Sequence, residues 1–173
     1  VDPQAICDAA FALAWFGGQQ QRGASALRRA AALNPNSFLV LMSSGWAHRY
    51  VGEFAIAEEH LLRAIRLNPI DPNIAAALTG LADLMHLRGD YEPAIRMLER
   101  AVAEQPGLFG PRLGLVATCW KTGRIAEARR HADDLRALVP DLSISGYLQD
   151  TADKVSDWNQ DIEDAMRVVG VPE

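Results

Sequence analysis

The 173-residue sequence has little of what a disulfide-stabilised, secreted or membrane-spanning protein needs. It contains only two cysteines, Cys7 and Cys119, and their number and separation exclude a disulfide framework. We expect both to be buried small apolar residues in a reducing cytoplasm. No apolar run approaches the roughly 20 residues of a membrane-spanning helix. Residues 1–3 do not resemble the basic start of a secretory signal, so we expect a cytoplasmic location and no membrane partner.

Basic residues are too few and too evenly balanced to indicate binding to nucleic acid. Residues 1–37 carry a net charge of +1, residues 38–140 are neutral and residues 141–173 carry −6, which gives −5 for the chain. No basic stripe of the kind that faces phosphates is present, so we expect no nucleic-acid partner. An initiator methionine is also missing, so we expect the chain to be a piece of a longer protein or a trimmed form of one.

Patterns that would indicate an enzyme or a cofactor site are missing as well. The glycines in residues 18–25 have the spacing of a phosphate-binding loop, but the stretch lacks the lysine that reaches the phosphates and follows a helix rather than a strand. The histidines His48, His60, His86 and His131 have no metal-ligand spacing with cysteine or carboxylate. We expect His48 in the core, and His60 and His131 on solvated faces. We predict that the chain is no enzyme and has neither cofactor nor metal.

What the sequence does contain is a unit that recurs. The best-formed copy runs from Leu41 to Pro69, with helical spacing of apolar residues on both sides of Gly52. Prolines at positions 35, 69, 106 and 140 close successive units, at separations of 34, 37 and 34 residues. This period and the residues that accompany it resemble the tetratricopeptide repeat family. The resemblance implies an all-α fold, a right-handed α–α superhelix of about four helix–turn–helix repeats with a C-terminal capping helix.

The repeats are expected to fill residues 1–140, in four successive stretches of about 4–37, 38–71, 75–108 and 109–140. Residues 141–173 are expected to form a C-terminal cap, with a helix at about 156–169 that turns Trp158 and Ile162 to one apolar face. A stacked array exposes the apolar side of its last repeat, and a cap with a polar outer face keeps it soluble.

The repeat pattern also predicts a surface for binding a partner. In this family the first helices of successive repeats line a concave groove. Placing the pattern on the sequence predicts these residues near the groove: Trp15, Phe16, Trp46, Arg49, Tyr50, Asp83, His86 and Trp120. Tryptophan, tyrosine and arginine are the types enriched in binding hot spots, so we predict a groove for a protein or peptide partner. The alternative is that these rings pack between neighbouring first helices or beneath the C-terminal cap.

Residues 61–173 resemble a narrower group. The resemblance lies in AIRLNPIDP (64–72), RGDYEPAI (88–95), TGRIAEAR (122–129), VPDLSIS (139–145) and VVGVPE (168–173). This succession is similar to the C-terminal repeat region of bacterial class III adenylate/guanylate cyclases and related winged-helix regulators. It implies a non-catalytic interaction and regulatory module at the C-terminal end of an adenylate cyclase-type signalling protein. Two alternatives remain: a self-association (dimerisation) module, in which the partner is another copy of the chain, and the repeat region of a winged-helix transcriptional regulator.

Overall fold

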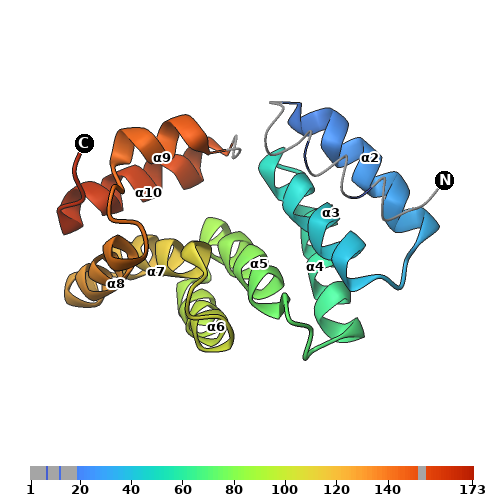
Figure 1. The fold of residues 1–173 in the computed structure, drawn as a ribbon, viewed down its shortest axis with the longest axis horizontal. Coiled ribbons are helices and arrows are strands. Elements are labelled where there is room, and N and C mark those ends of the chain that lie inside the picture. The colour runs from blue at the N-terminus through green and yellow to red at the C-terminus, as the bar shows by residue number, and fades with distance from the viewer. Residues whose placement is uncertain (1–6, 8–11, 13–18, 152–154) are drawn as a thin grey trace. The chain divides into compact units, whose positions relative to one another are not determined.

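All regular elements that the structure describes are α-helices (Figure 1). The structure, a computed structural model, describes Cys7, Ala12, residues 19–151 and residues 155–173. Its helices are α2 (Gln20–Leu33), α3 (Phe38–Tyr50), α4 (Phe54–Leu67), α5 (Ile74–Arg88), α6 (Tyr91–Glu104), α7 (Phe109–Lys121), α8 (Ile125–Leu138), α9 (Ile144–Asp150) and α10 (Ser156–Val169). The all-α class predicted from the sequence is confirmed for this part of the chain.

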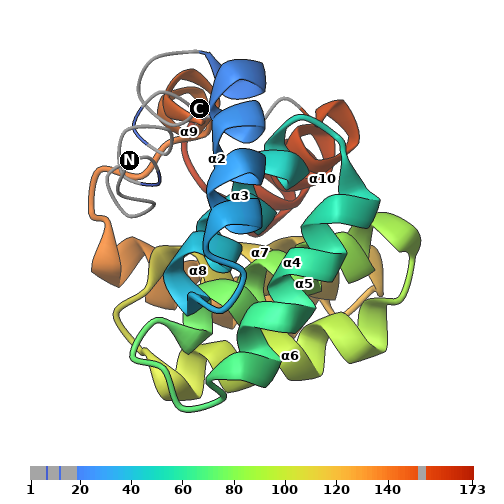
Figure 2. The same cartoon turned by 90° about the vertical axis from the view of Figure 1, so that its right-hand side faces the viewer.

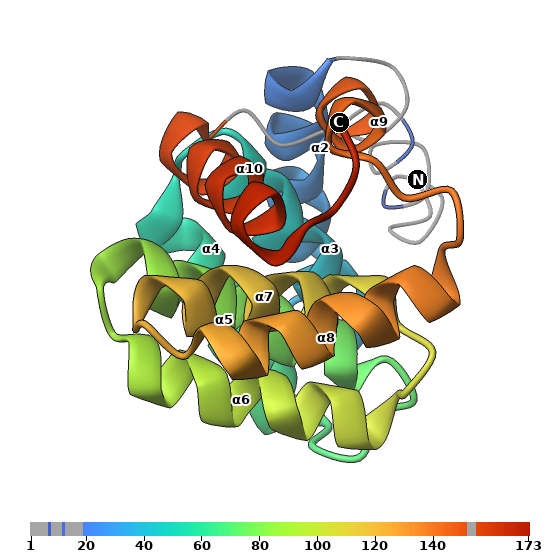
Figure 3. The same cartoon turned by 90° about the vertical axis from the view of Figure 1, so that its left-hand side faces the viewer.

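The chain divides into two compact units, and the boundary falls inside α5. Unit 1 contains α2, α3, α4 and the part of α5 up to Leu81, whereas unit 2 contains the rest of α5 from Ala82 together with α6 to α10. In unit 1, α3 packs against both α2 and α4 (Figure 2). In unit 2, α7 packs against α6, α8 and α10 (Figure 3).

The same glycine turn joins the two helices of each of three pairs in the described residues, α3 with α4, α5 with α6, and α7 with α8. Gly52, Gly89 and Gly123 have φ values of +78°, +88° and +76°, in the left-handed region that glycine enters without steric cost. In the first of these turns the N–H of Glu53 donates to the carbonyl of His48 at 2.9 Å, five residues back. This is the hydrogen bond of the Schellman motif, which ends a helix and satisfies one of its last carbonyl groups.

The helices of each pair meet where small residues face large ones. In unit 1, Ala57 and Leu61 of α4 are fully buried, and Gly45 of α3 faces Leu61. A Cβ atom on Gly45 would lie 2.5 Å from Cγ of Leu61, so α3 and α4 are too close to admit a methyl group. The same kind of contact occurs between successive pairs, where Gly114 of α7 faces Leu98 of α6, with 2.9 Å from a Cβ atom on Gly114 to the nearest side-chain atom.

Both cysteines are buried, as the sequence predicted. Cys7 is 1% exposed and Cys119 of α7 has no exposed surface. Burial raises the pKa of the Cys119 thiol to about 11, because an apolar environment disfavours the thiolate. Cys119 is therefore a packing residue of unit 2 and an unreactive thiol at neutral pH.

The close approach of α3 and α4 predicts that Gly45→Ala lowers the free energy of unfolding by about 1–3 kcal/mol, the usual cost of overpacking. The loss is expected although alanine favours a helix by up to about 1 kcal/mol over glycine. Chemical denaturation measures it. Gly107→Ala is the matched control, because a Cβ there meets nothing within 4 Å, and it should change stability by no more than about 0.5 kcal/mol.

The double variant Gly45→Ala/Leu61→Ala tests the cause. Once the Leu61 side chain is removed, the methyl group at position 45 should no longer be destabilising when compared with Leu61→Ala alone. A loss of the same size in both backgrounds would show that the contact between these two residues is not responsible.

Candidate functional site

Six of the eight residues predicted for the groove lie in the part of the chain that the structure describes, and all six come from the first helices of pairs: Trp46, Arg49, Tyr50, Asp83, His86 and Trp120. Trp15 and Phe16 lie outside the described residues. Of the six, only the two tryptophans are partly exposed, and the other four are buried. The sequence left open whether these residues face a partner or pack inside the protein, and the four buried side chains are packed inside it.

In unit 1, three side chains of α3 form one aromatic and cationic group. The ring centres of Trp46 and Tyr50 are 5.5 Å apart, and the guanidinium carbon of Arg49 lies 5.6 and 5.8 Å from them. These distances allow cation–π attraction between Arg49 and both rings. The indole N–H of Trp46 also donates to the carbonyl oxygen of Ala76 on α5 at 3.1 Å. Trp46 is thus held in one orientation, with part of its ring exposed.

Unit 1 contains a second polar group, centred on His48, that the sequence did not predict. His48 is fully buried, as expected, and its Nδ1 lies 2.6 Å from the carbonyl oxygen of Ser44. Since a carbonyl only accepts, Nδ1 carries the proton, and Nε2 accepts from Nε–H of Arg28 at 3.4 Å. Burial lowers the pKa of His48, and burial is also the main reason that the pKa of His60 is lowered, followed by repulsion between the two imidazoles when both are protonated. His60 is half-buried, which corrects the expectation that it is solvated.

The Ser44 hydroxyl lies between two imidazole rings, as a catalytic nucleophile would. Its Oγ is 2.9 Å from Nδ1 of His60 and 3.3 Å from Nδ1 of His48. Serine hydrolases use such a base to activate the hydroxyl. Ser44 has no exposed surface, however, so a substrate cannot reach it. The group therefore connects α3 to α4 and performs no chemistry on a substrate.

In unit 2, His86 of α5 bridges α7 and α10. Its Nδ1 lies 3.0 Å from Oγ1 of Thr118, and its Nε2 lies 3.0 Å from Oδ2 of Asp161. The Thr118 hydroxyl donates its only proton to the carbonyl of Gly114 at 2.7 Å, so it accepts from His86. Both ring nitrogens then face acceptors, and both carry protons. His86 is therefore an imidazolium ion, buried beside a carboxylate.

Asp161 of α10 receives a second cation. Its Oδ1 lies 2.6 Å from Nζ of Lys121, at the end of α7. Burial alone raises the pKa of Asp161, but the hydrogen bonds from Lys121 and His86 outweigh burial and hold it below its usual value. The same hydrogen bond raises the pKa of Lys121. We call Asp161, His86 and Lys121 the charged triad of unit 2.

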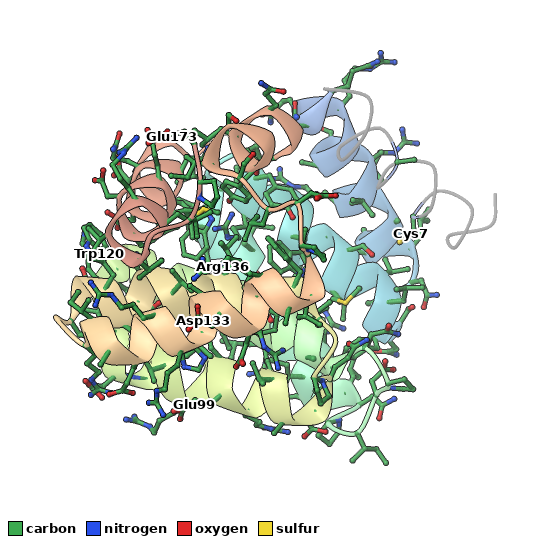
Figure 4. The ribbon with its side chains drawn as sticks, turned by 60° about the vertical axis from the view of Figure 1, so that its left-hand side comes forward. Cys7, Glu99, Trp120, Asp133, Arg136 and Glu173 are labelled. Carbon is green, nitrogen blue, oxygen red and sulfur yellow. The ribbon has the colours of Figure 1, made fainter. Side chains whose placement is uncertain are left out.

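Aromatic rings surround the charged triad. The ring of Trp158 on α10 meets His86 edge-on at 5.2 Å, and the ring of Tyr91 does so at 5.4 Å. Trp120, labelled in Figure 4, neighbours the triad because Nζ of Lys121 lies 5.2 Å from its ring centre. Two of the predicted groove residues of unit 2, His86 and Trp120, thus lie beside side chains that contact α10, which is the alternative of packing beneath the C-terminal cap.

Among the residues that the structure describes, no three or more histidine, cysteine or acidic side chains are placed to hold a metal ion. Within the same residues, no helix has both the length and the apolar character needed to cross a membrane.

Solved structures with a similar fold include repeat proteins. MamA 41-end from Desulfovibrio magneticus RS-1 is 21% identical, with a TM-score of 0.64, and the match covers 79% of this chain and 75% of that one. MamA of MSR-1 is 18% identical, with a TM-score of 0.62 and coverage of 97% and 98%. A mutant O-GlcNAc transferase of Thermobaculum terrenum is 20% identical, with a TM-score of 0.66, over 79% of this chain and 27% of that one. At these identities the similarity shows the fold alone.

The stretches that match models of a protein family cover more than half of the chain. No curated protein matches it. Two tetratricopeptide repeat models match, one over residues 41–103 and the other over residues 85–145. The matched stretches overlap and contain most of α3 and all of α4 to α8, which are the helix pairs with glycine turns. The chain therefore belongs to the tetratricopeptide repeat family.

Proposed function

We propose that this chain is a non-catalytic interaction module that binds a polypeptide partner on the surface of its first helices. Tetratricopeptide repeats stack helix pairs into extended surfaces of the kind used for protein–protein interaction. In unit 1 the proposed contact residue is Trp46, and in unit 2 it is Trp120. Trp15 and Phe16 belong to the same proposal.

The observation that carries this proposal is the fixed, partly exposed indole of Trp46. Its N–H is bonded to the carbonyl of Ala76, and its ring lies beside Arg49 and Tyr50. A side chain that is ordered before binding loses little conformational entropy when a partner docks on it. Tryptophan is also the type most often found to dominate binding energy.

A photoreactive residue at position 46 tests the proposal. Trp46→p-benzoylphenylalanine in the full chain is expected to crosslink a polypeptide in cells that make the protein, detected by gel shift and identified by mass spectrometry. The matched control is the same substitution at Arg66, an exposed residue of the second helix α4, which should not capture that polypeptide. Equal capture at both positions, or none at position 46 in a folded chain, would contradict the proposal.

We further propose that the module is the regulatory C-terminal part of a cytoplasmic, adenylate cyclase-type signalling protein. The support is the succession of segments from residues 64–72 to residues 168–173, which is similar to the repeat region of those cyclases. The gene sequence upstream of the codon for Val1 tests this. A cyclase catalytic domain is expected there, whereas a winged-helix domain would favour the transcriptional regulator instead.

Self-association is the second candidate function, and uneven charge favours it. The helix α2 contains three arginines and no acidic residue, whereas α10 contains four acidic residues and one arginine. Oppositely charged surfaces on one chain can attract each other in head-to-tail contacts between copies. In that case the partner is a second copy of the chain.

Light scattering over a concentration series tests self-association. This candidate function predicts a molar mass above 18.9 kDa that rises with concentration at low salt. Salt of about 0.5 M should return the mass toward that of the monomer, because it shortens the reach of charge attraction to a few ångströms. A monomer at every concentration in low salt would rule self-association out.

A further inference from the structure

The C-terminal helix α10 packs on unit 2 through one apolar face. The side chains of that face recur every three or four residues and are all buried: Trp158, Ile162, Ala165, Met166 and Val169. The helix α10 packs against α7, α8 and α9 (Figure 3). The rest of α10 carries more acidic than basic side chains, with Asp157, Glu163 and Asp164 beside Asp161 and against Arg167.

The helix α10 extends beyond the last helix pair, α7 and α8, and reaches the pair before it. A helix that covered only that pair would need contacts with α7 and α8. Asp161 and Trp158 reach further, to His86 on α5, which is the first helix of the preceding pair. The helix α10 therefore lies on first helices, which is the surface proposed above for a polypeptide partner.

This surface has one position that binds a carboxylate group, between Lys121 and His86. Lys121 of α7 and the protonated His86 of α5 both bond to Asp161, one to each oxygen. Thr118 fixes the His86 ring by accepting from its other nitrogen. Charge-assisted hydrogen bonds of this kind are roughly twice as strong as neutral ones, and they require the ligand's charge to lie at one place along its helix.

We propose that the surface under α10 is a binding site for an acidic amphipathic helix, and that α10 occupies it within the chain as a partner's helix would from outside. The site comprises His86, Thr118 and Lys121 with the apolar side of α7. This inference rests on the proposed function and names its partner class. The partner helix carries an aromatic residue, a carboxylate three positions later and an aliphatic residue at the fourth, as Trp158, Asp161 and Ile162 do.

Covalent attachment makes α10 a strong competitor. A tethered ligand has an effective concentration that reaches the millimolar range for a short connection. A free helix with the same contacts is therefore excluded from the unaltered chain until α10 is released. The site is closed in the structure for this reason, and opening it requires the loss of the contacts that Asp161 makes.

A peptide of residues 156–173 with a fluorescent label tests the proposal by anisotropy. In the full chain, Asp161→Lys places a third positive charge beside Lys121 and His86 and should release α10. The labelled peptide is expected to bind this variant at least ten-fold more tightly than the unaltered chain. A peptide that itself carries Asp161→Lys should bind the variant at least ten-fold more weakly than the native peptide does.

Asp164→Lys is the matched control. It makes the same charge change on the same helix, but Asp164 pairs with Arg167 of α10 itself, and its attraction for Lys121 is the weakest of the effects that raise the pKa of Lys121. The chain with Asp164→Lys should exclude the peptide as the unaltered chain does. Equal binding to all three chains, or no binding to a folded Asp161→Lys chain, would overturn the proposal.

Hydrogen exchange on the unaltered chain gives a second test that needs no variant. Amides of Ile162 and Ala165 are expected to exchange at least ten-fold faster than those of Val116 and Ala117 in α7, because α10 opens separately. Equal rates would show that α10 unfolds only together with α7, and the proposal would then be wrong. The crosslinking experiment at position 46 tests the surface of α3, whereas the peptide and exchange experiments test the surface under α10. A failure of this inference is therefore distinguishable from a failure of the proposed function.

Discussion

The close approach of neighbouring helices is the constraint on which the rest of this structure depends. Gly45 leaves room for Leu61 where α3 meets α4, and Gly114 does so for Leu98 where α6 meets α7. Contacts of this kind fix how far apart two helices lie, because protein interiors are packed too densely to absorb an extra methyl group. Side chains on the first helices then have fixed positions before any partner arrives.

Two buried histidines are accommodated in opposite protonation states, His48 as the neutral form and His86 as the charged form. His48 is surrounded by a carbonyl acceptor and an arginine donor, so its neutral form fits the site. His86 faces acceptors on both sides and is charged, and Asp161 balances it. The neutral His48 does not need the Glu53 carboxylate that lies 3.5 Å from its Nε2, whereas the charged His86 requires the partner that α10 supplies.

Local patterns were sufficient to predict the helices but not the site. Helical spacing on either side of Gly52 predicted α3 and α4, because amphipathic faces and glycine turns are encoded within a few residues. The bond between His86 and Asp161 joins residues 75 positions apart, and no local pattern specifies it. The repeat pattern placed Arg49 near the groove, but it did not show that two aromatic neighbours allow its guanidinium to be buried.

The burial of Cys119 has a practical consequence for the chemistry of unit 2. With its pKa at about 11, only about one thiol in ten thousand is ionised at neutral pH. Oxidants and alkylating reagents act on the thiolate, so the folded protein resists both at this position. The rate at which Cys119 becomes alkylated would then report how often the interior of unit 2 is transiently exposed to solvent. This side chain is therefore a built-in probe of local opening in unit 2.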